Sequence, residues 1–150
     1  MRRTTGTATL ALVLMLLLPA ICSADCSITT TGVNFGPYDV FDSSPVDSTG
    51  SVRYQCSGNT NSFTIAIGRG SSPTFMPRTL RNGADAMDYN LYVDAARTSV
   101  WGDGTSGTTL FTVSNPTGKA VNVPIFGRIQ PGQDIAAGTY SDSIVVTIQF

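Results

Sequence analysis

The clearest pattern of hydrophobic and polar positions lies at the end of the chain. The segment from Tyr140 to Phe150 is predicted to be extended, and from Ser143 onward apolar and mostly polar side chains alternate. The apolar set is Ile144, Val146, Ile148 and Phe150, and the intervening set is Ser143, Val145, Thr147 and Gln149. A period of two is that of a β-strand with one buried face. This segment therefore predicts a strand that ends the chain, with the apolar set on its inner face.

Shorter runs of the same kind occupy the rest of the chain, separated by turn residues. They cover residues 27–31, 33–35, 50–56, 63–67, 79–81, 88–94, 108–113 and 119–126. Turns are predicted at Gly36-Pro37, at Asn82-Gly83 and at Asn115–Gly118. The best helical candidate, residues 83–87, is too short to be stable. Short strands with turns at intervals of about 8–12 residues predict an all-β fold, a single immunoglobulin-like β-sandwich.

The first 24 residues have the layout of a secretory signal peptide. Arg2 and Arg3 precede an uncharged apolar run over residues 10–18, and Ser23-Ala24 suits cleavage before Asp25. The run is shorter than the roughly 20 residues that span a bilayer. A lipoprotein at Cys22 or Cys26 is disfavoured, because Ile21 and Asp25 precede these cysteines. We therefore expect a signal peptide over residues 1–24 and one domain over residues 25–150, exported through the periplasm without a transmembrane segment. The destination is the cell surface, a pilus or the medium.

Charge and residue types exclude several classes of function. The net charge is −1 for the whole chain and −3 without the two arginines of the first 24 residues, and no basic cluster exists to attract nucleic acid. Histidine is absent, so a serine or cysteine nucleophile would lack its usual base. Lys119, the only lysine, lies in a predicted turn. The chain is therefore predicted not to be an enzyme.

Metal sites and phosphate cradles find little support in the pattern. Calcium could use Asp85, Asp88 or Asp103, but their spacing is not that of a known calcium loop. Zinc lacks both histidine and spare thiols. The glycine-rich stretches 68–70 and 102–107 do not lead into a helix, which a phosphate cradle requires. No cofactor or metal is expected.

Two cysteines remain once the first 24 residues are removed, Cys26 and Cys56. An even pair in an oxidising compartment predicts a disulfide. The alternative is a pair of free buried thiols.

Several segments, taken together and in order, resemble a known family. They are Tyr89–Tyr92, 94–98, Val123–Gly127, 137–142, the closing strand, and the two cysteines that bracket residues 32–38. In these segments the chain resembles the spore coat protein U domain family, and especially the pilin subunits of archaic, Csu-type chaperone–usher pili. The resemblance covers nearly all of residues 25–150.

This resemblance implies a sandwich that lacks its final strand and is completed by donor-strand complementation. Ile144, Val146, Ile148 and Phe150 would line the groove, and the carboxylate of Phe150 would anchor basic residues of a chaperone. The expected partners are a periplasmic pilus chaperone, an outer-membrane usher and other pilin or coat subunits. The implied function is that of a structural subunit of a surface pilus or of a spore or cell coat, serving adhesion or biofilm formation.

The pattern alone leaves alternatives open. Any half-buried strand alternates, so the last strand also fits the interior of a complete sandwich. Trp101 and Tyr92 could stack on sugar rings in a self-sufficient, lectin-like domain, although tryptophan in a sandwich more often packs in the core. Asp94 and Arg97 are expected to pair locally around the turn at Ala95-Ala96.

The segment before the first cysteine departs from the pilin pattern. Only Asp25 would precede Cys26 after cleavage, which is too short to fill a groove in a neighbour. This predicts a subunit that accepts a donor strand and does not supply one, at the tip or end of a fibre or in a coat without long fibres.

Overall fold

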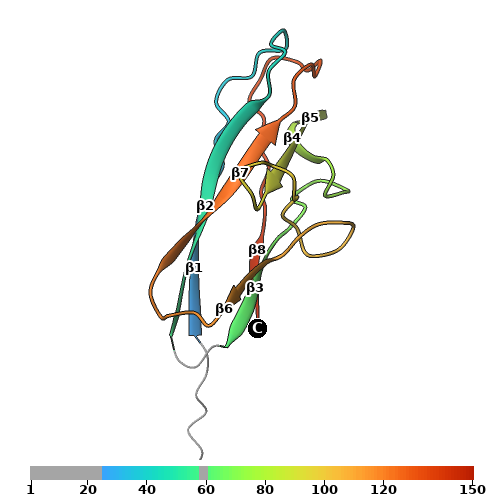
Figure 1. The fold of residues 1–150 in the computed structure, drawn as a ribbon. Helices are drawn as coiled ribbons and strands as arrows, with labels where there is room; N and C mark the ends of the chain where they lie inside the picture. The colour runs from blue at the N-terminus through green and yellow to red at the C-terminus, as the bar shows by residue number, and fades with distance from the viewer. Residues whose placement is uncertain (1–24, 58–60) are drawn as a thin grey trace, which may run out of the picture.

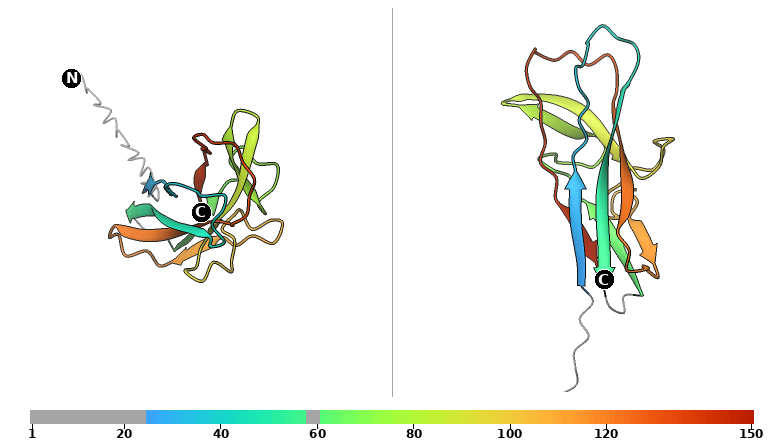
Figure 2. Two further views of the ribbon diagram at one scale, coloured as in Figure 1. Left: turned by 90° about the horizontal axis from the view of Figure 1, so that it is seen from above. Right: turned by 90° about the vertical axis from the view of Figure 1, so that its left-hand side faces the viewer.

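A computed structural model describes residues 25–57 and 61–150, which form two antiparallel sheets packed face to face (Figures 1 and 2). The larger sheet has the order β1 (Asp25–Thr31), β2 (Val46–Ser57), β7 (Val121–Ile129), β5 (Asp85–Tyr92) and β4 (Arg78–Asn82). The smaller sheet has the order β6 (Phe111–Ser114), β3 (Ser62–Ile67) and β8 (Val146–Gln149). Within the described residues there is no helix. The predicted all-β sandwich is confirmed; residues 1–24, with the predicted signal peptide, lie outside the described residues.

The core lies between the sheets and follows the period of two on each strand. On β2, Val52 and Tyr54 are buried while Arg53 faces solvent, and on β3, Phe63 and Ile65 are buried. Trp101 is 0 % exposed, and its Nε1 donates a hydrogen bond of 2.9 Å to the carbonyl of Ile65. The hypothesis that Trp101 stacks on a sugar is therefore wrong. Its ring fills the core, where a large aromatic side chain contributes most.

Arg78, on β4, is the one charged residue that is fully buried in the described part of the chain. Its guanidinium donates to three carbonyl oxygens, those of Ile67 (3.3 Å), Gly68 (3.0 Å) and Trp101 (2.6 Å), and to Oδ1 of Asn90 (2.8 Å). Burial lowers the pKa of Arg78. Because buried charges are costly unless they are hydrogen-bonded, these four hydrogen bonds are what allows an arginine to be buried at this position.

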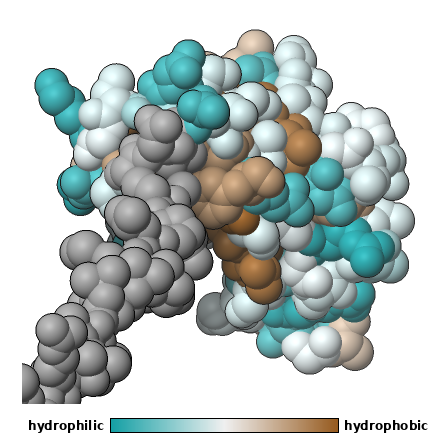
Figure 3. All heavy atoms as spheres, turned by 90° about the horizontal axis from the view of Figure 1, so that it is seen from below, coloured by the Kyte–Doolittle hydropathy of each residue, from teal (hydrophilic) through white to brown (hydrophobic). Residues whose placement is uncertain are grey.

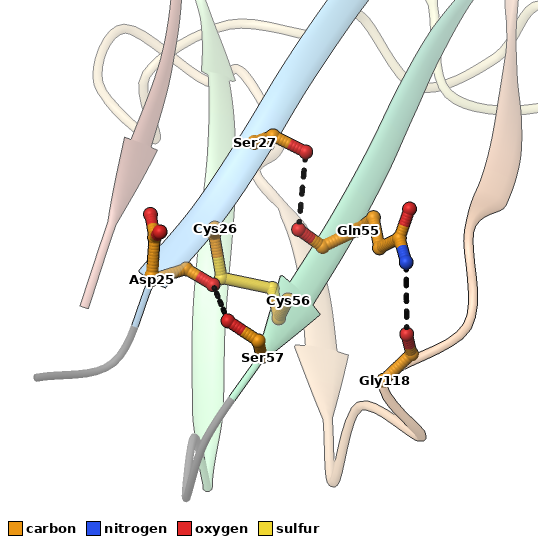
Figure 4. Close-up of a disulfide and its surroundings, with 7 residues drawn as sticks. All are labelled: Asp25, Cys26, Ser27, Gln55, Cys56, Ser57 and Gly118. Carbon is orange, nitrogen blue, oxygen red and sulfur yellow. Dashed lines mark hydrogen bonds between the residues drawn. A yellow bond between two sulfur atoms is a disulfide. The ribbon is translucent and has the colours of Figure 1, made fainter. Parts of the chain in front are cut away.

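Cys26 and Cys56 form a disulfide that ties β1 to β2 (Figure 4). The two residues are directly opposite each other in the register of the two strands, and their Cα atoms are 4.0 Å apart. Around the bond, the Ser57 hydroxyl donates to the carbonyl of Asp25 and the Ser27 hydroxyl to that of Gln55. The predicted pairing is thus present, at the end of β1 that begins the domain.

Residues 83–87, judged too short for a helix, form a turn and the first part of β5, because backbone pairing of Asp85 with Asn82 and of Met87 with Leu80 makes a hairpin there. One local prediction, the Asp94–Arg97 ion pair, is wrong. The Asp94 carboxylate accepts from the amides of the two residues before Val100, and Arg97 pairs with a distant aspartate on β2.

That distant aspartate is Asp47, which lies between two arginines on the outer face of the larger sheet. Its Oδ1 is 2.7 Å from Nε of Arg128, and its Oδ2 is 3.2 Å from Nη1 of Arg97. The hydrogen bonds from Arg128 lower the pKa of Asp47 below its usual value. Register across β2 and β7, which no local pattern reports, brings Asp47 opposite Arg128.

Candidate functional site

The two sheets each end in an outer strand on the side where the candidate site lies. In the described residues, β1 pairs only with β2, and β8 pairs only with β3. The outer edge of such a strand carries backbone N–H and C=O groups that have no partner in the sheet. β8 and β1 therefore each offer an edge to which a further strand could pair.

A groove with a volume of ≈ 1120 Å³ opens between the sheets on this side. One wall is the segment 30–42, which comprises the end of β1 and the residues after it, and the other is the segment 135–146, which ends at the first residue of β8. Its apolar lining includes Val33, Phe35, Tyr38, Val46, Ile67, Leu80, Met87, Tyr89, Leu91, Ile125, Ile129, Ile135, Ile144 and Val146. The volume exceeds the roughly 300–1,000 Å³ of small-molecule pockets, and the lining is that of a hydrophobic core.

Hydrophobic surface also lies at the end of the molecule where the chain terminates. Figure 3 views this end and shows hydrophobic side chains gathered in its middle, with hydrophilic ones around them. Phe150, the last residue, is 71 % exposed there. Large exposed apolar surface is uncommon on self-contained domains and marks interaction sites.

The first wall packs against two glycines of the larger sheet, Gly127 and Gly50, whose missing side chains leave a notch in the sheet surface. A Cβ on Gly127 of β7 would lie 2.7 Å from Cγ1 of Val33 and 2.8 Å from Cζ of Phe35. A Cβ on Gly50 of β2 would lie 2.9 Å from Val33. The absence of side chains at both positions thus lets Val33 and Phe35 lie against the sheet. Phe35 also meets the ring of Tyr89 edge-on, with centroids 5.9 Å apart.

The second wall is fixed by hydrogen bonds from side chains at its start. The Gln133 amide group donates to the carbonyl of Asp88 (2.8 Å) and accepts from its backbone N–H (2.6 Å). The hydroxyl of Tyr38, on the first wall, donates to the carbonyl of Gln130 and accepts from the N–H of Gln133. These bonds join both walls to β5 at one end of the groove, so its width there is set by the protein itself.

Further along, the second wall crosses from the larger sheet to the smaller one. Ser141 exchanges two backbone hydrogen bonds with Arg81 of β4, at 2.8 and 3.0 Å. Four residues later the carbonyl of Val145 accepts from Gly68, next to β3. The segment then becomes β8. The crossing explains why the regular strand covers only Val146–Gln149, although the alternation predicts a strand from Tyr140.

Asp142 anchors the middle of this crossing. Its carboxylate accepts from the backbone N–H and hydroxyl of Ser71, both at 2.9 Å, and from the hydroxyl of Tyr89 at 2.8 Å. Burial, followed by the bond to Asp142, raises the pKa of Tyr89. The phenol therefore stays protonated and keeps donating at any physiological pH. Sequence analysis missed this anchor, because an aspartate in an extended segment gives no sign of a partner far along the chain.

The four predicted groove residues do not all have the same surroundings in the structure. Ile144 and Val146 line the groove, while Val145 between them is 72 % exposed. Ile148 packs against the core outside the lining of the groove. Phe150 is exposed, with its ring centroid 6.2 Å from that of Phe63. The alternation is therefore present from Ile144 to Ile148 but does not extend to Phe150, and the contact of all four residues with a donor strand stays a prediction.

The aspartates considered as calcium ligands, Asp85, Asp88 and Asp103, are not brought together as one group in the described ranges. Within residues 25–57 and 61–150, no three histidine, cysteine, aspartate or glutamate side chains gather as metal ligands would. Asp103 binds the amide and hydroxyl of Thr105 through Oδ1, and these bonds lower its pKa. In the same ranges no helix is long and apolar enough to cross a membrane.

Comparison with known proteins gives three consistent results. The model of the Spore Coat Protein U domain family matches residues 9–147. Protein U of Myxococcus xanthus is 37 % identical over 131 residues, which are 79 % of this chain and 71 % of that protein. Among solved structures, the chaperone–tip adhesion subunit pre-assembly complex CsuC–CsuE, from archaic chaperone–usher Csu pili of Acinetobacter baumannii, contains a similar chain. That match has a TM-score of 0.59 and 25 % identity, and covers 85 % of this chain but only 40 % of the other.

Proposed function

This chain belongs to the Spore Coat Protein U domain family, and on that premise we propose that it is a structural subunit of a surface pilus or coat that accepts a donor strand. The observation that carries the proposal is the apolar groove between the segments 30–42 and 135–146, bordered by strands with a free edge. Such a surface is costly in water and is covered most readily by an added strand.

The incoming segment would pair with the outer edge of β8 and place alternate side chains in the groove. Strand addition satisfies the free N–H and C=O groups of β8, and the alternate side chains replace the missing part of the core. A strand rises about 3.3 Å per residue, so about ten residues would follow the wall from Ser141 to Gln149. The size of the groove favours a strand over a small ligand, since its volume of ≈ 1120 Å³ exceeds the usual range of small-molecule pockets.

The partners are proposed from the similar proteins. A chain that resembles this one is solved in a complex of a chaperone with a tip adhesion subunit. By analogy, a periplasmic chaperone would cover the groove first, and another pilin or coat subunit would then replace it at an outer-membrane usher. The assembled subunit would lie on the cell surface, serve adhesion or biofilm formation, and have no catalytic role. A place at the tip or end of a fibre remains a prediction from the short segment before Cys26.

A synthetic donor peptide tests the proposal directly. The probe is a ten-residue peptide that alternates Val or Ile with Thr or Ser, and its control is the same composition with the alternation shuffled. At a peptide concentration 100 times the Kd, binding to the folded state contributes about 2.7 kcal/mol, which raises the Tm by roughly 10 °C. We expect this rise with the alternating peptide alone.

Two neighbouring valines provide matched variants for the same experiment. Val146→Lys places a charge in the groove and should abolish the response, whereas Val145→Lys alters a side chain that is 72 % exposed and should keep it. Amide hydrogen exchange of β8 gives a second readout, because a paired edge protects its N–H groups. If neither peptide changes the Tm or the exchange of β8, the domain is complete by itself, and the alternative of a self-sufficient binding domain stands in its place.

A further inference from the structure

A second cavity lies between two loops that project from the right-hand side of Figure 1, the turns that follow β3 and the connection between β5 and β6. Its volume is ≈ 430 Å³, and none of its lining residues lines the groove. Its lining combines two opposite charges, hydroxyl groups and apolar side chains: Arg69, Asp103, Thr74, Thr105, Ser106, Pro73, Phe75 and Met76.

The first loop holds the guanidinium of Arg69 in place. Nη1 of Arg69 donates to the carbonyl of Pro73 at 2.7 Å, and the carbonyl of Arg69 accepts from the N–H of Ser72. The guanidinium carbon lies 5.9 Å from the centre of the Phe75 ring, which is itself buried. A guanidinium has five N–H donors, so one bond to Pro73 leaves donors for a ligand.

The second loop holds the carboxylate of Asp103. Oδ1 accepts from the backbone N–H of Thr105 at 2.9 Å and from its hydroxyl at 2.6 Å. Thr108 closes the loop, since its N–H donates to the carbonyl of Thr105 and its hydroxyl accepts from the N–H of Gly104. Within the described residues Oδ2 of Asp103 accepts no hydrogen bond, so a fixed acceptor lines the cavity.

The two charges favour a neutral ligand that both accepts and donates. Arg69 and Asp103 form no ion pair within 4.0 Å, although both line one cavity. Together they carry no net charge, so neither an anion nor a cation is selected. A hydroxyl group can accept from a guanidinium and donate to a carboxylate, and adjacent hydroxyls on one ring can do both at once. Met76, which is 47 % exposed, and Pro73 add apolar surface for the C–H groups of such a ring.

We propose that this cavity binds one neutral saccharide ring, with Arg69 donating to its hydroxyl oxygens and Asp103 accepting from its hydroxyl groups. The volume lies within the range of small-ligand pockets. Both loops are closed by their own hydrogen bonds, so little ordering would accompany binding. The proposal is independent of donor-strand acceptance, because the cavity and the groove share no residue.

Amide chemical shifts of the labelled protein test the proposal with three neutral probes, methyl α-D-mannoside, methyl β-D-galactoside and N-acetyl-D-glucosamine. At least one should shift the amides of residues 69–76 and 103–108 in a saturable way and leave those of β8 unchanged. Asp103→Asn and Arg69→Gln should each weaken binding about tenfold, the effect of one lost charge-assisted hydrogen bond. Arg53→Gln, on the exposed face of β2, is the matched control and should bind as the wild type does.

Two results would overturn the saccharide site. One is the absence of saturable shifts in these loops with all three probes. The other is equal affinity in the wild type and both variants, which would place binding elsewhere. Should either variant fail to fold, Met76→Gln replaces it, because that side chain is half-exposed and should weaken binding by removing apolar contact. The same titration with the donor peptide present should give the same affinity, so failure of the groove proposal would not affect this outcome.

Discussion

Removing the disulfide between Cys26 and Cys56 should cost a large part of the stability of this domain. The bond closes a loop with a sequence separation of 30 residues. In the chain-entropy account, a loop of that length restricts the unfolded chain by about 3.6 kcal/mol at 25 °C. Domains of this size are stable by about 5–15 kcal/mol in total, so the loss is a substantial fraction. Cys26→Ala/Cys56→Ala should therefore lower the Tm by roughly 14 °C.

The position of the bond adds a second, local consequence. β1 pairs only with β2 in the described part of the chain, and the groove wall at residues 30–42 lies inside the closed loop. Without the disulfide, β1 should fray from the end at Asp25, and its amides should exchange faster than those of β7. The donor peptide should also bind more weakly, because one wall of its groove is less well held.

Urea unfolding, in oxidising buffer and in buffer with dithiothreitol, measures the effect. The wild type should lose about 3.6 kcal/mol on reduction, whereas the double alanine variant should be unchanged by the reductant. Because reduction keeps both side chains, it separates the cross-link from the packing of Cys56. A wild-type difference below about 1 kcal/mol would refute the reasoning, since it would mean that the unfolded chain gains little freedom when the loop opens.

Three further substitutions test single interactions. Arg78→Met removes the donor of four hydrogen bonds to buried oxygens and should cost about 4 kcal/mol in urea unfolding; wild-type stability would contradict the buried network. Tyr89→Phe should make the free energy of unfolding depend less on pH above about pH 10. Because the pKa of Tyr89 is raised in the folded state, its contribution to stability is complete below about pH 10 and is lost above it, at about 1.4 kcal/mol per pH unit. An equally steep decline of the variant between pH 10 and 12 would contradict this. Asp47→Asn should make the stability of the protein less sensitive to acid. Because the pKa of Asp47 is lowered in the folded state, its carboxylate stabilises the fold above about pH 4, and this stabilisation is lost below that pH. The Tm at pH 3 and pH 7 checks this, and an unchanged difference would exclude a role of the ion pair with Arg128.

The sequence predicted those features that depend on near neighbours. The alternation at the end of the chain correctly turned Ile144, Val146 and Ile148 inward and Val145 outward, because side-chain direction in an extended segment follows from the period alone. The pairing of Cys26 with Cys56 needed only their number and the compartment. The class of fold followed from short strands and frequent turns.

Features that depend on distant contacts could not be predicted in this way. Arg78 lies in the core because carbonyl oxygens from two other segments surround it, and an arginine in a short strand usually faces water. Asp142 resembles an ordinary turn residue, yet it anchors a groove wall to Tyr89. The acceptance of a missing strand remains a prediction, since the free edge of β8 defines where a strand would fit and the partner chain would define what fills it.

The notch under the first groove wall has a consequence for how this family can vary. Gly127 leaves room for Phe35 and Val33, and any side chain there would have to displace one of them. The residues at the positions of Gly127 and Phe35 should therefore change together in evolution. A relative with alanine or serine at the position of Gly127 should carry a smaller residue than phenylalanine at the position of Phe35. Such compensated pairs would mark relatives whose grooves differ in depth and thus in the strands they admit.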